Sequence, residues 1–198
     1  MEYLCSIFNH SSYEGNVPEN ALVLGNISRF DRNKNQLFRL EVFREILRYR
    51  PDAVLLLGGN DAGYLERVRA RAAELNLSDR VRFIGPRDDV PRCLKMIDIY
   101  LVPSFFEGFS ISLLEAQAAG CLCAASDGIP RDADMWLGRV LFLSLSCSAK
   151  EWADQIMENY SRLRPLRQNE IMERFIETGF EISASSAELR KIYESVKQ

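Results

Sequence analysis

Residues 102–120 read VPSFFEGFSISLLEAQAAG, and this stretch decides how the fold of the chain is interpreted. The apolar run Ile99–Val102 leads into it, a loop containing Gly108 occupies its middle, and strong helix formers complete it. This order predicts a strand, a loop and a helix, with the carboxylates Glu107 and Glu115 eight positions apart. Because a helix N-terminus presents unpaired N–H groups and a partial positive charge, the loop is suited to receive an anion.

Apolar runs of strand length alternate with segments of helical periodicity on both sides of this stretch. Residues 53–57 are apolar at every position, which is typical of a central parallel strand covered on both faces. We expect strands at 21–27, 53–57, 81–84, 99–102, 121–125 and 140–143, and helices at 36–48, 64–75, 90–96 and the end of the quoted stretch. The alternation predicts an α/β fold, a Rossmann-like doubly wound parallel sheet of about six strands with helices on both faces.

The two ends of the chain differ from its middle. Residues 1–20 mix polar, glycine and proline positions with a few apolar ones and predict an irregular lead-in packed by Tyr3, Ile7 and Phe8. Residues 149–198 are expected to be helical, because serine and glutamate stand at positions 148 and 151, and again at 185 and 188, with capping-box spacing. No linker or repeat interrupts the 198 residues, so we expect a single domain.

Composition limits the kind of protein. A net charge of −3 gives no indication of a nucleic-acid surface, so an anion site must be local. No apolar window approaches the roughly eighteen residues of a membrane span, and the first ten residues lack signal-peptide features, so we expect a cytoplasmic protein. The odd number of cysteines in apolar surroundings favours reduced core thiols over disulfides or metal ligands; they are Cys5, Cys93, Cys121, Cys123 and Cys147.

The quoted stretch, with its Glu-x7-Glu spacing, resembles the donor-site signature of the group 1 glycosyltransferases, retaining enzymes of family 4 with the two-domain GT-B fold. Residues 27–35 resemble the Arg-x4-Lys turn of that family, and residues 81–90 resemble its following strand and nucleobase loop. Residues 125–127 and 142–145 are similar to capsular and exopolysaccharide enzymes. The resemblance spans about residues 20–160 and implies half of a GT-B fold, the half that binds the donor.

The resemblance implies that Arg29 and Lys34 contact the diphosphate of a nucleoside-diphosphate sugar and that Glu107 meets hydroxyls of the donor sugar. Cations stabilise a leaving diphosphate without a metal, with arginine suited to a bidentate grip and lysine acting as a point charge. Both cations follow the first strand, at the carboxyl edge of the sheet where ligands of doubly wound folds bind. The residues alone would also fit a solvated basic turn, with Arg32 between the two, and a surface carboxylate at Glu107.

Backbone groups near the helix start are further expected ligands. Gly108 permits a close approach of the backbone. The N–H groups of the next four residues are expected to point at phosphate or sugar oxygens; these are Phe109, Ser110, Ile111 and Ser112.

Glu115 has two interpretations. The resemblance assigns it to the ribose hydroxyls, whereas its spacing from Ser112 also fits a capping box, in which its carboxylate would reach back to the Ser112 N–H. The resemblance further implies that Ile84, Gly85 and Arg87 form the edge that reads uracil or another base.

No metal or further cofactor is expected. Asp132 and Asp134 form an Asp-x-Asp pattern that is common by chance, and a site already rich in cations has less need of a metal. The only histidine, His10, lies in the lead-in with nothing around it that fits nucleophilic catalysis.

The sequence therefore predicts the donor-binding domain of a retaining glycosyltransferase of surface-polysaccharide assembly, with a UDP-sugar as the favoured substrate. The acceptor, a saccharide or lipid-linked saccharide, would be bound by an N-terminal domain absent from this chain, which could bring the enzyme to the inner face of the membrane. Alone, the chain should bind donor and catalyse little, and its uncovered crevice leaves homo-oligomers open. Two other functions stay open: a non-catalytic nucleotide-binding or assembly module, and a fragment of a GT-B-like sugar-nucleotide epimerase.

Overall fold

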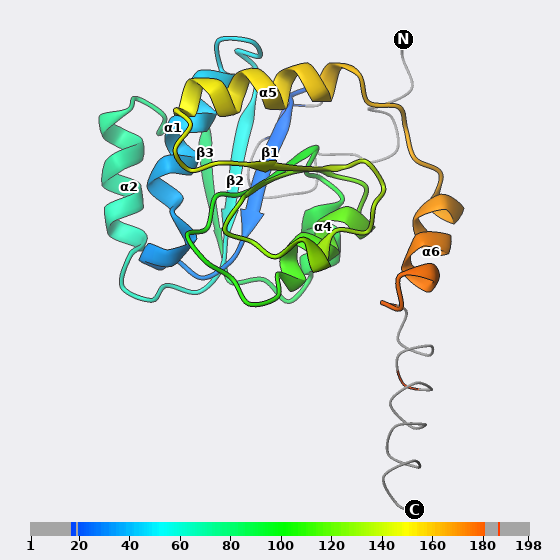
Figure 1. The fold of residues 1–198 in the computed structure, drawn as a ribbon. Helices are drawn as coiled ribbons and strands as arrows, with labels where there is room; N and C mark the ends of the chain where they lie inside the picture. Colours follow the sequence, from blue (N-terminus) through cyan, green and yellow to red (C-terminus); the bar gives the residue numbers. More distant parts are fainter. Residues whose placement is uncertain (1–16, 19, 181–185, 187–198) are drawn as a thin grey trace, which may run out of the picture.

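The six predicted strands form one sheet in which all neighbouring strands are parallel (Figure 1). The computed structural model describes residues 17–18, 20–180 and 186. The order across the sheet is β3-β2-β1-β4-β5-β6, so the winding direction reverses between β1 and β4, as in a doubly wound fold. The strands are β1 (Val23–Ile27), β2 (Val54–Gly58), β3 (Val81–Gly85), β4 (Ile99–Val102), β5 (Leu122–Ser126) and β6 (Val140–Leu143).

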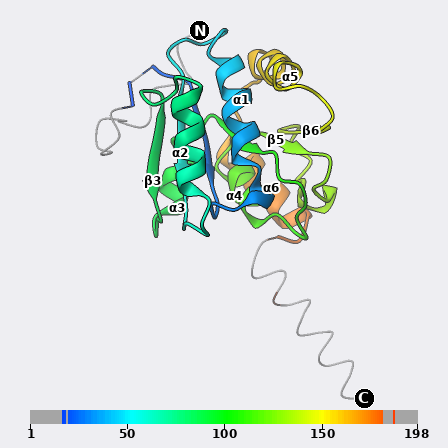
Figure 2. The same cartoon turned by 90° about the vertical axis from the view of Figure 1, so that its left-hand side faces the viewer.

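Helices cover both faces of this sheet, as predicted. One face carries α1 (Gln36–Ile46), α2 (Leu65–Glu74) and α5 (Ala149–Ser161), and the other carries α3 (Val90–Leu94), α4 (Ile111–Ala118) and the 3-10 helix η3 (Arg131–Ala133). A second 3-10 helix, η2 (Arg32–Lys34), follows β1, and α6 (Gln168–Glu177) packs beside α4. Figure 2 shows α1 and α2 side by side on the near face, with α5 beside α1.

Two helices end two residues before their predicted ends. The helix predicted at 36–48 ends at Ile46, and the one predicted at 90–96 ends at Leu94. In both, the following residues tighten into i to i+3 bonds, since Arg48 N donates to Glu45 O and Met96 N donates to Cys93 O. The apolar periodicity continues through such a turn, which is why it did not mark the end of the helix.

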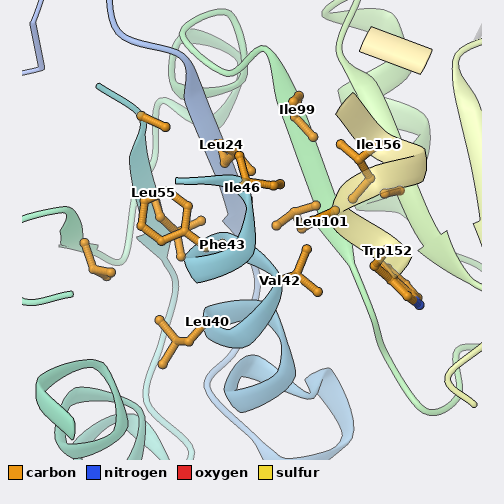
Figure 3. Packing of buried hydrophobic residues seen from close by; sticks show 14 of the residues in the cluster. Leu24, Leu40, Val42, Phe43, Ile46, Leu55, Ile99, Leu101, Trp152 and Ile156 are labelled. Carbon is orange, nitrogen blue, oxygen red and sulfur yellow. The ribbon is translucent and has the colours of Figure 1, made fainter. Parts of the chain in front are cut away.

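The larger hydrophobic cluster lies between the sheet and the helices α1 and α5 (Figure 3). Phe43 and Ile46 of α1 pack over Leu24 and Leu55 of the central strands, and Trp152 of α5 is fully buried beside them. The Trp152 indole Nε1 donates to the Ser144 carbonyl at 2.8 Å, and its ring meets Phe38 edge-on at a centroid distance of 5.3 Å. These contacts anchor α5 on α1.

The predicted capping box at the start of α5 is confirmed. Ser148 Oγ accepts from Glu151 N at 3.2 Å, while Glu151 Oε2 accepts from Ser148 N at 2.7 Å. The segment from 149 is helical in α5 and α6, with an irregular connection at 162–167. The second box at 185 and 188, and the lead-in residues Tyr3, Cys5, Ile7, Phe8 and His10, lie outside the described residues.

Four cysteines belong to the described part of the chain, and all four are free thiols, as predicted. Burial raises the pKa of Cys121 to about 12 and raises that of Cys123 as well, so both stay protonated at neutral pH. Among the described helices, none is both long enough and apolar enough to cross a membrane.

Candidate functional site

A pocket of about 570 Å³ opens beside the carboxyl ends of β1 and β4, where the winding of the sheet reverses. Loops after β1, β2 and β4 supply its lining, which consists of Arg29, Asp31, Asn33, Lys34, Ala62, Phe106, Glu107, Gly108 and Phe109. Five of these nine residues are predicted site residues, so the structure brings the Arg-x4-Lys turn and the loop of the 102–120 stretch into one pocket.

The turn after β1 is built by η2. Asp31 precedes η2 and its Oδ1 accepts from Lys34 N at 3.2 Å. Asn35 follows with a φ of 50°, a left-handed conformation that asparagine tolerates better than most residues. This single residue ends η2 and begins α1, so Lys34 sits at the corner where the chain turns toward the pocket.

Three bonds join this turn to the loop after β4. Phe105 N donates to Asn33 O at 2.9 Å, and Asn33 Nδ2 donates to Phe106 O at 2.6 Å. Lys34 Nζ then lies 3.1 Å from Glu107 Oε1. The two loops are therefore held as one unit, and two residues predicted to touch different parts of the donor form an ion pair.

Glu107 is not the surface carboxylate of the alternative interpretation, because only 9% of the residue is exposed. Besides Lys34, its Oε1 accepts from Ser104 Oγ at 2.7 Å. Burial raises the pKa of Glu107, but the hydroxyls of Ser104 and Ser110 and the ammonium of Lys34 together outweigh it and lower the pKa below its ordinary value. Ser110 acts by proximity, since its buried Oγ lacks a well-aligned hydrogen bond. Glu107 is therefore ionised at neutral pH, and the stability it contributes is lost as the pH falls through its lowered pKa.

Arg29 differs from Lys34 in its exposure. Its side chain is 71% exposed and reaches Asp31 Oδ2 only at 3.8 Å, so this surface pair holds it weakly. Its backbone is fixed from below, because Gln36 Nε2 donates to Arg29 O at 2.8 Å. The guanidinium can move toward a ligand while its Cα stays in place. A solvated basic turn thus describes Arg29 and Arg32 but not Lys34.

The start of α4 differs in part from the prediction. The helix begins at Ile111, and Ile111 N donates to Phe109 O at 3.2 Å, so this N–H does not point at a ligand as expected. Ser110, Ile111 and Ser112 do not line the pocket, whereas Gly108 and Phe109 do. The Ser112 hydroxyl instead acts on the buried Tyr100, where it opposes part of the rise in pKa that burial causes.

The capping-box interpretation of Glu115 is wrong. Because α4 begins at Ile111, Ser112 already lies inside the helix, and Glu115 is an exposed residue in the second turn. Within the described part of the chain, its carboxylate has no hydrogen bond to Ser112. Glu115 does not line the 570 Å³ pocket, so its ribose role stays a prediction.

The predicted base edge also lies outside this pocket lining. Gly85 O accepts from Gly59 N at 2.8 Å. Arg87 donates from Nε to Asp89 Oδ1 at 2.8 Å and from Nη2 to Asp89 Oδ2 at 3.0 Å, so these groups already have partners in the protein. The role of Ile84, Gly85 and Arg87 stays a prediction.

In the Asp-x-Asp pattern, Asp132 lies in η3 and Asp134 directly follows it, and neither lines the pocket. Asp134 Oδ1 accepts from Trp136 N at 2.8 Å and so closes a local turn. Over residues 17–18, 20–180 and 186, no group of three or more His, Cys, Asp or Glu could hold a metal ion.

Several residues that shape the pocket were not predicted from the sequence, including Asn33, Ser104 and Gln36. Asn33 lies inside the Arg-x4-Lys spacing, so its position offered a clue. Ser104 stands three residues before Glu107, but nothing in the sequence shows that its hydroxyl turns inward.

Comparison with known proteins agrees with this geometry. The model of the family "Glycosyl transferases group 1" matches residues 9–169. The chain belongs to the group 1 glycosyltransferases. Its relatives include EpsF of Bacillus subtilis (strain 168), named provisionally as a glycosyltransferase, with 29% identity over 89% of this chain and 46% of EpsF. They also include the capsular polysaccharide biosynthesis glycosyltransferase CapH of Staphylococcus aureus, with 27% identity over 85% of this chain and 46% of CapH.

Solved structures of other proteins share the fold. A glycosyltransferase from Rickettsia africae ESF-5 superposes with a TM-score of 0.77 at 22% identity, covering 92% of this chain and 49% of that one. HepE of Anabaena, solved in complex with UDP and glucose, superposes with a TM-score of 0.68 at 19% identity, covering 86% of this chain and 49% of that one. The chain thus spans about half the length of the proteins it matches.

Proposed function

We propose that this group 1 glycosyltransferase chain is the domain that binds the donor, a nucleoside-diphosphate sugar and most naturally a UDP-sugar, in a retaining transfer of surface-polysaccharide assembly. The observation that carries the proposal is the pocket at the β1 and β4 edge, which joins Arg29, Lys34 and Glu107. The UDP bound in HepE and the capsular role in the name of CapH support the substrate class and the setting.

The geometry suits transfer from a diphosphate leaving group. As the bond between the anomeric carbon and the diphosphate breaks, the bonding electron pair leaves with the diphosphate, and Lys34 and the mobile guanidinium of Arg29 stabilise its charge. Glu107, ionised and held by Ser104 and Lys34, accepts hydrogen bonds from sugar hydroxyls and orients the ring. The acceptor oxygen then forms the new bond to the anomeric carbon, and the proton of the acceptor hydroxyl passes to an oxygen of the departing diphosphate.

The acceptor side of the reaction is proposed to belong to a second domain. Relatives about twice as long as this chain support that view, as does the resemblance to two-domain GT-B enzymes. In the whole protein this domain would bind a saccharide or lipid-linked saccharide and place the reaction at the inner face of the membrane. Glu115 and the edge formed by Ile84, Gly85 and Arg87 would bind the ribose and the base once the nucleotide is in place.

Titration calorimetry tests the proposal. We expect the chain to bind UDP more tightly than GDP or ADP. We also expect the matching sugar nucleotide to bind more tightly than the bare diphosphate, because Glu107 adds sugar contacts. Absence of binding for all three nucleotides would instead favour a structural or assembly module. Conversion of the sugar to its epimer would favour the epimerase alternative.

Arg29 provides a matched pair of variants for the diphosphate role. Arg29→Ala should weaken UDP binding by more than about tenfold, since charge-assisted bonds to phosphate contribute roughly 1.5–3 kcal/mol. Arg32 lies three residues after Arg29 and carries the same charge, but its side chain does not line the pocket. Arg32→Ala should therefore change the affinity for UDP less than about threefold. Equal losses in the two variants would mean that only the general charge of the turn matters.

A further inference from the structure

A buried arginine lies directly behind the candidate donor pocket. Only 1% of Arg39 is exposed, although it is the fourth residue of α1 and carries a full positive charge. Its Nη2 donates to Lys34 O at 3.3 Å, and its Nε has no hydrogen-bond partner. No carboxylate of the described residues forms an ion pair with it, so a large solvation cost is only partly repaid.

The charges that line the pocket explain what this cation could do. The lining contains two cations, Arg29 and Lys34, and two carboxylates, Asp31 and Glu107, so its formal charges cancel. A diphosphate entering such a lining meets no excess of positive formal charge. Arg39 lies just outside the lining, and its positive charge makes the sum over these four residues and Arg39 positive.

Arg39 interacts electrostatically with Glu107 across this boundary. Burial lowers the pKa of Arg39 to about 10, and interactions with Tyr100 and Glu107 oppose that shift. The guanidinium therefore stays charged at neutral pH and offsets the Glu107 carboxylate from the protein side. Lys34 faces Glu107 from the pocket side. Because Arg39 offsets part of the Glu107 charge, Glu107 cancels less of the attraction between Lys34 and a ligand.

We propose that Arg39 is a positioning residue of the donor site, a buried cation that holds the Lys34 backbone and gives the pocket its net positive charge. The inference rests on the proposed function, since it concerns how the same pocket attracts a diphosphate. Gln36 offers a comparison, because it lies three residues earlier on α1, is equally buried, and holds the Arg29 carbonyl in the same way without a charge.

The test compares Arg39→Met, Arg39→Lys and Gln36→Met in the full chain. Arg39→Met should weaken UDP binding on the order of tenfold, since one charge is lost in surroundings of low dielectric, while binding of uncharged uridine stays the same. Arg39→Lys should recover most of the loss, and Gln36→Met should cost less than about threefold, since it removes one neutral hydrogen bond. The loss in Arg39→Met should persist in high salt, because a buried charge is poorly screened.

Stability separates this role from a merely structural one. Because the buried guanidinium lacks a paired carboxylate, Arg39→Met should unfold in urea at the same concentration as the wild type or at a higher one. A lower unfolding midpoint together with parallel losses for UDP and uridine would overturn the proposal, as would unchanged UDP affinity in Arg39→Met.

One measurement needs no nucleotide. The pKa of Glu107, followed by NMR, should rise in Arg39→Met, because a cation is lost while Lys34, Ser104 and Ser110 remain around the carboxylate. If the wild type binds none of the three nucleoside diphosphates, the proposed function fails and the site-charging role fails with it. If the wild type binds but the pKa of Glu107 does not move in Arg39→Met, only the inference about Arg39 fails.

Discussion

Replacing Lys34 with methionine should weaken binding of the nucleoside diphosphate by more than about a hundredfold, a loss of roughly 2.7 kcal/mol or more. The substitution removes a cation from the pocket and also leaves the carboxylate of Glu107, 3.1 Å away in the native pair, without its ammonium partner. A buried, unpaired negative charge then faces the phosphates. The loss should exceed that of Arg29→Ala, because Arg29 has no comparable carboxylate to release. Calorimetry with UDP measures both.

A double-mutant cycle isolates the contribution of repulsion. Lys34→Met combined with Glu107→Gln removes the unpaired charge, so the double variant should bind UDP about tenfold more tightly than Lys34→Met alone. Glu107→Gln by itself should bind UDP at least as tightly as the wild type and lose the extra affinity for the sugar nucleotide. A double variant as weak as Lys34→Met would show that Lys34 acts through its own phosphate contact and that Glu107 does not repel the ligand.

The fold could be predicted from sequence because each layer left a periodic pattern. Strands buried on both faces, such as β2, are apolar at every position, and the alternation with helices then leaves few topologies. The parallel pairing of the strands and the covering of both faces followed from this alternation. Helix ends at Ile46 and Leu94 did not, since the apolar pattern runs on through the last turn.

Site residues could be predicted only where they belong to a motif with a characteristic spacing. Arg29, Lys34 and Glu107 belong to motifs, and the structure places them in one pocket. The pairing of Lys34 with Glu107 could not be predicted, because it depends on how Asn33 joins two loops more than seventy residues apart.

The spacing of Arg39 in the sequence is consistent with its burial. Arg39 stands four residues before Phe43 and seven before Ile46, the spacing of one helix face, and both of those residues are fully buried. A charged residue on an apolar stripe is expected to turn outward, since long charged side chains usually keep their heads in water. Here the apolar stripe reaches the sheet edge beneath the pocket, and the Arg39 guanidinium donates to the Lys34 carbonyl. The inward direction of the Arg39 side chain therefore depends on tertiary structure.

Gly59 should be among the least replaceable residues of the site, although it does not line the pocket. Its φ of 134° is rarely adopted by other residues, and a Cβ there would lie 2.0 Å from the carbonyl oxygen of Ser28. Gly59→Ala should therefore lower the free energy of unfolding by roughly 3 kcal/mol, combining backbone strain with a clash against the main chain. Urea unfolding measures this loss.

Gly59→Ala should also affect ligand binding, because Ser28 directly precedes Arg29 and the turn that contains η2. Relieving the clash moves the backbone that leads into Arg29 and η2, so Gly59→Ala should also weaken UDP binding about tenfold or more, as a misplaced charge loses its phosphate contact. Gly63→Ala is the matched control, because Gly63 has a φ of 85° in the same loop but open space around its Cβ position. It should cost roughly 1 kcal/mol of stability and leave binding unchanged. If both variants behaved alike, the contact between Gly59 and Ser28 would not position the site, and the turn after β1 would owe its shape to η2 and Asn35 alone.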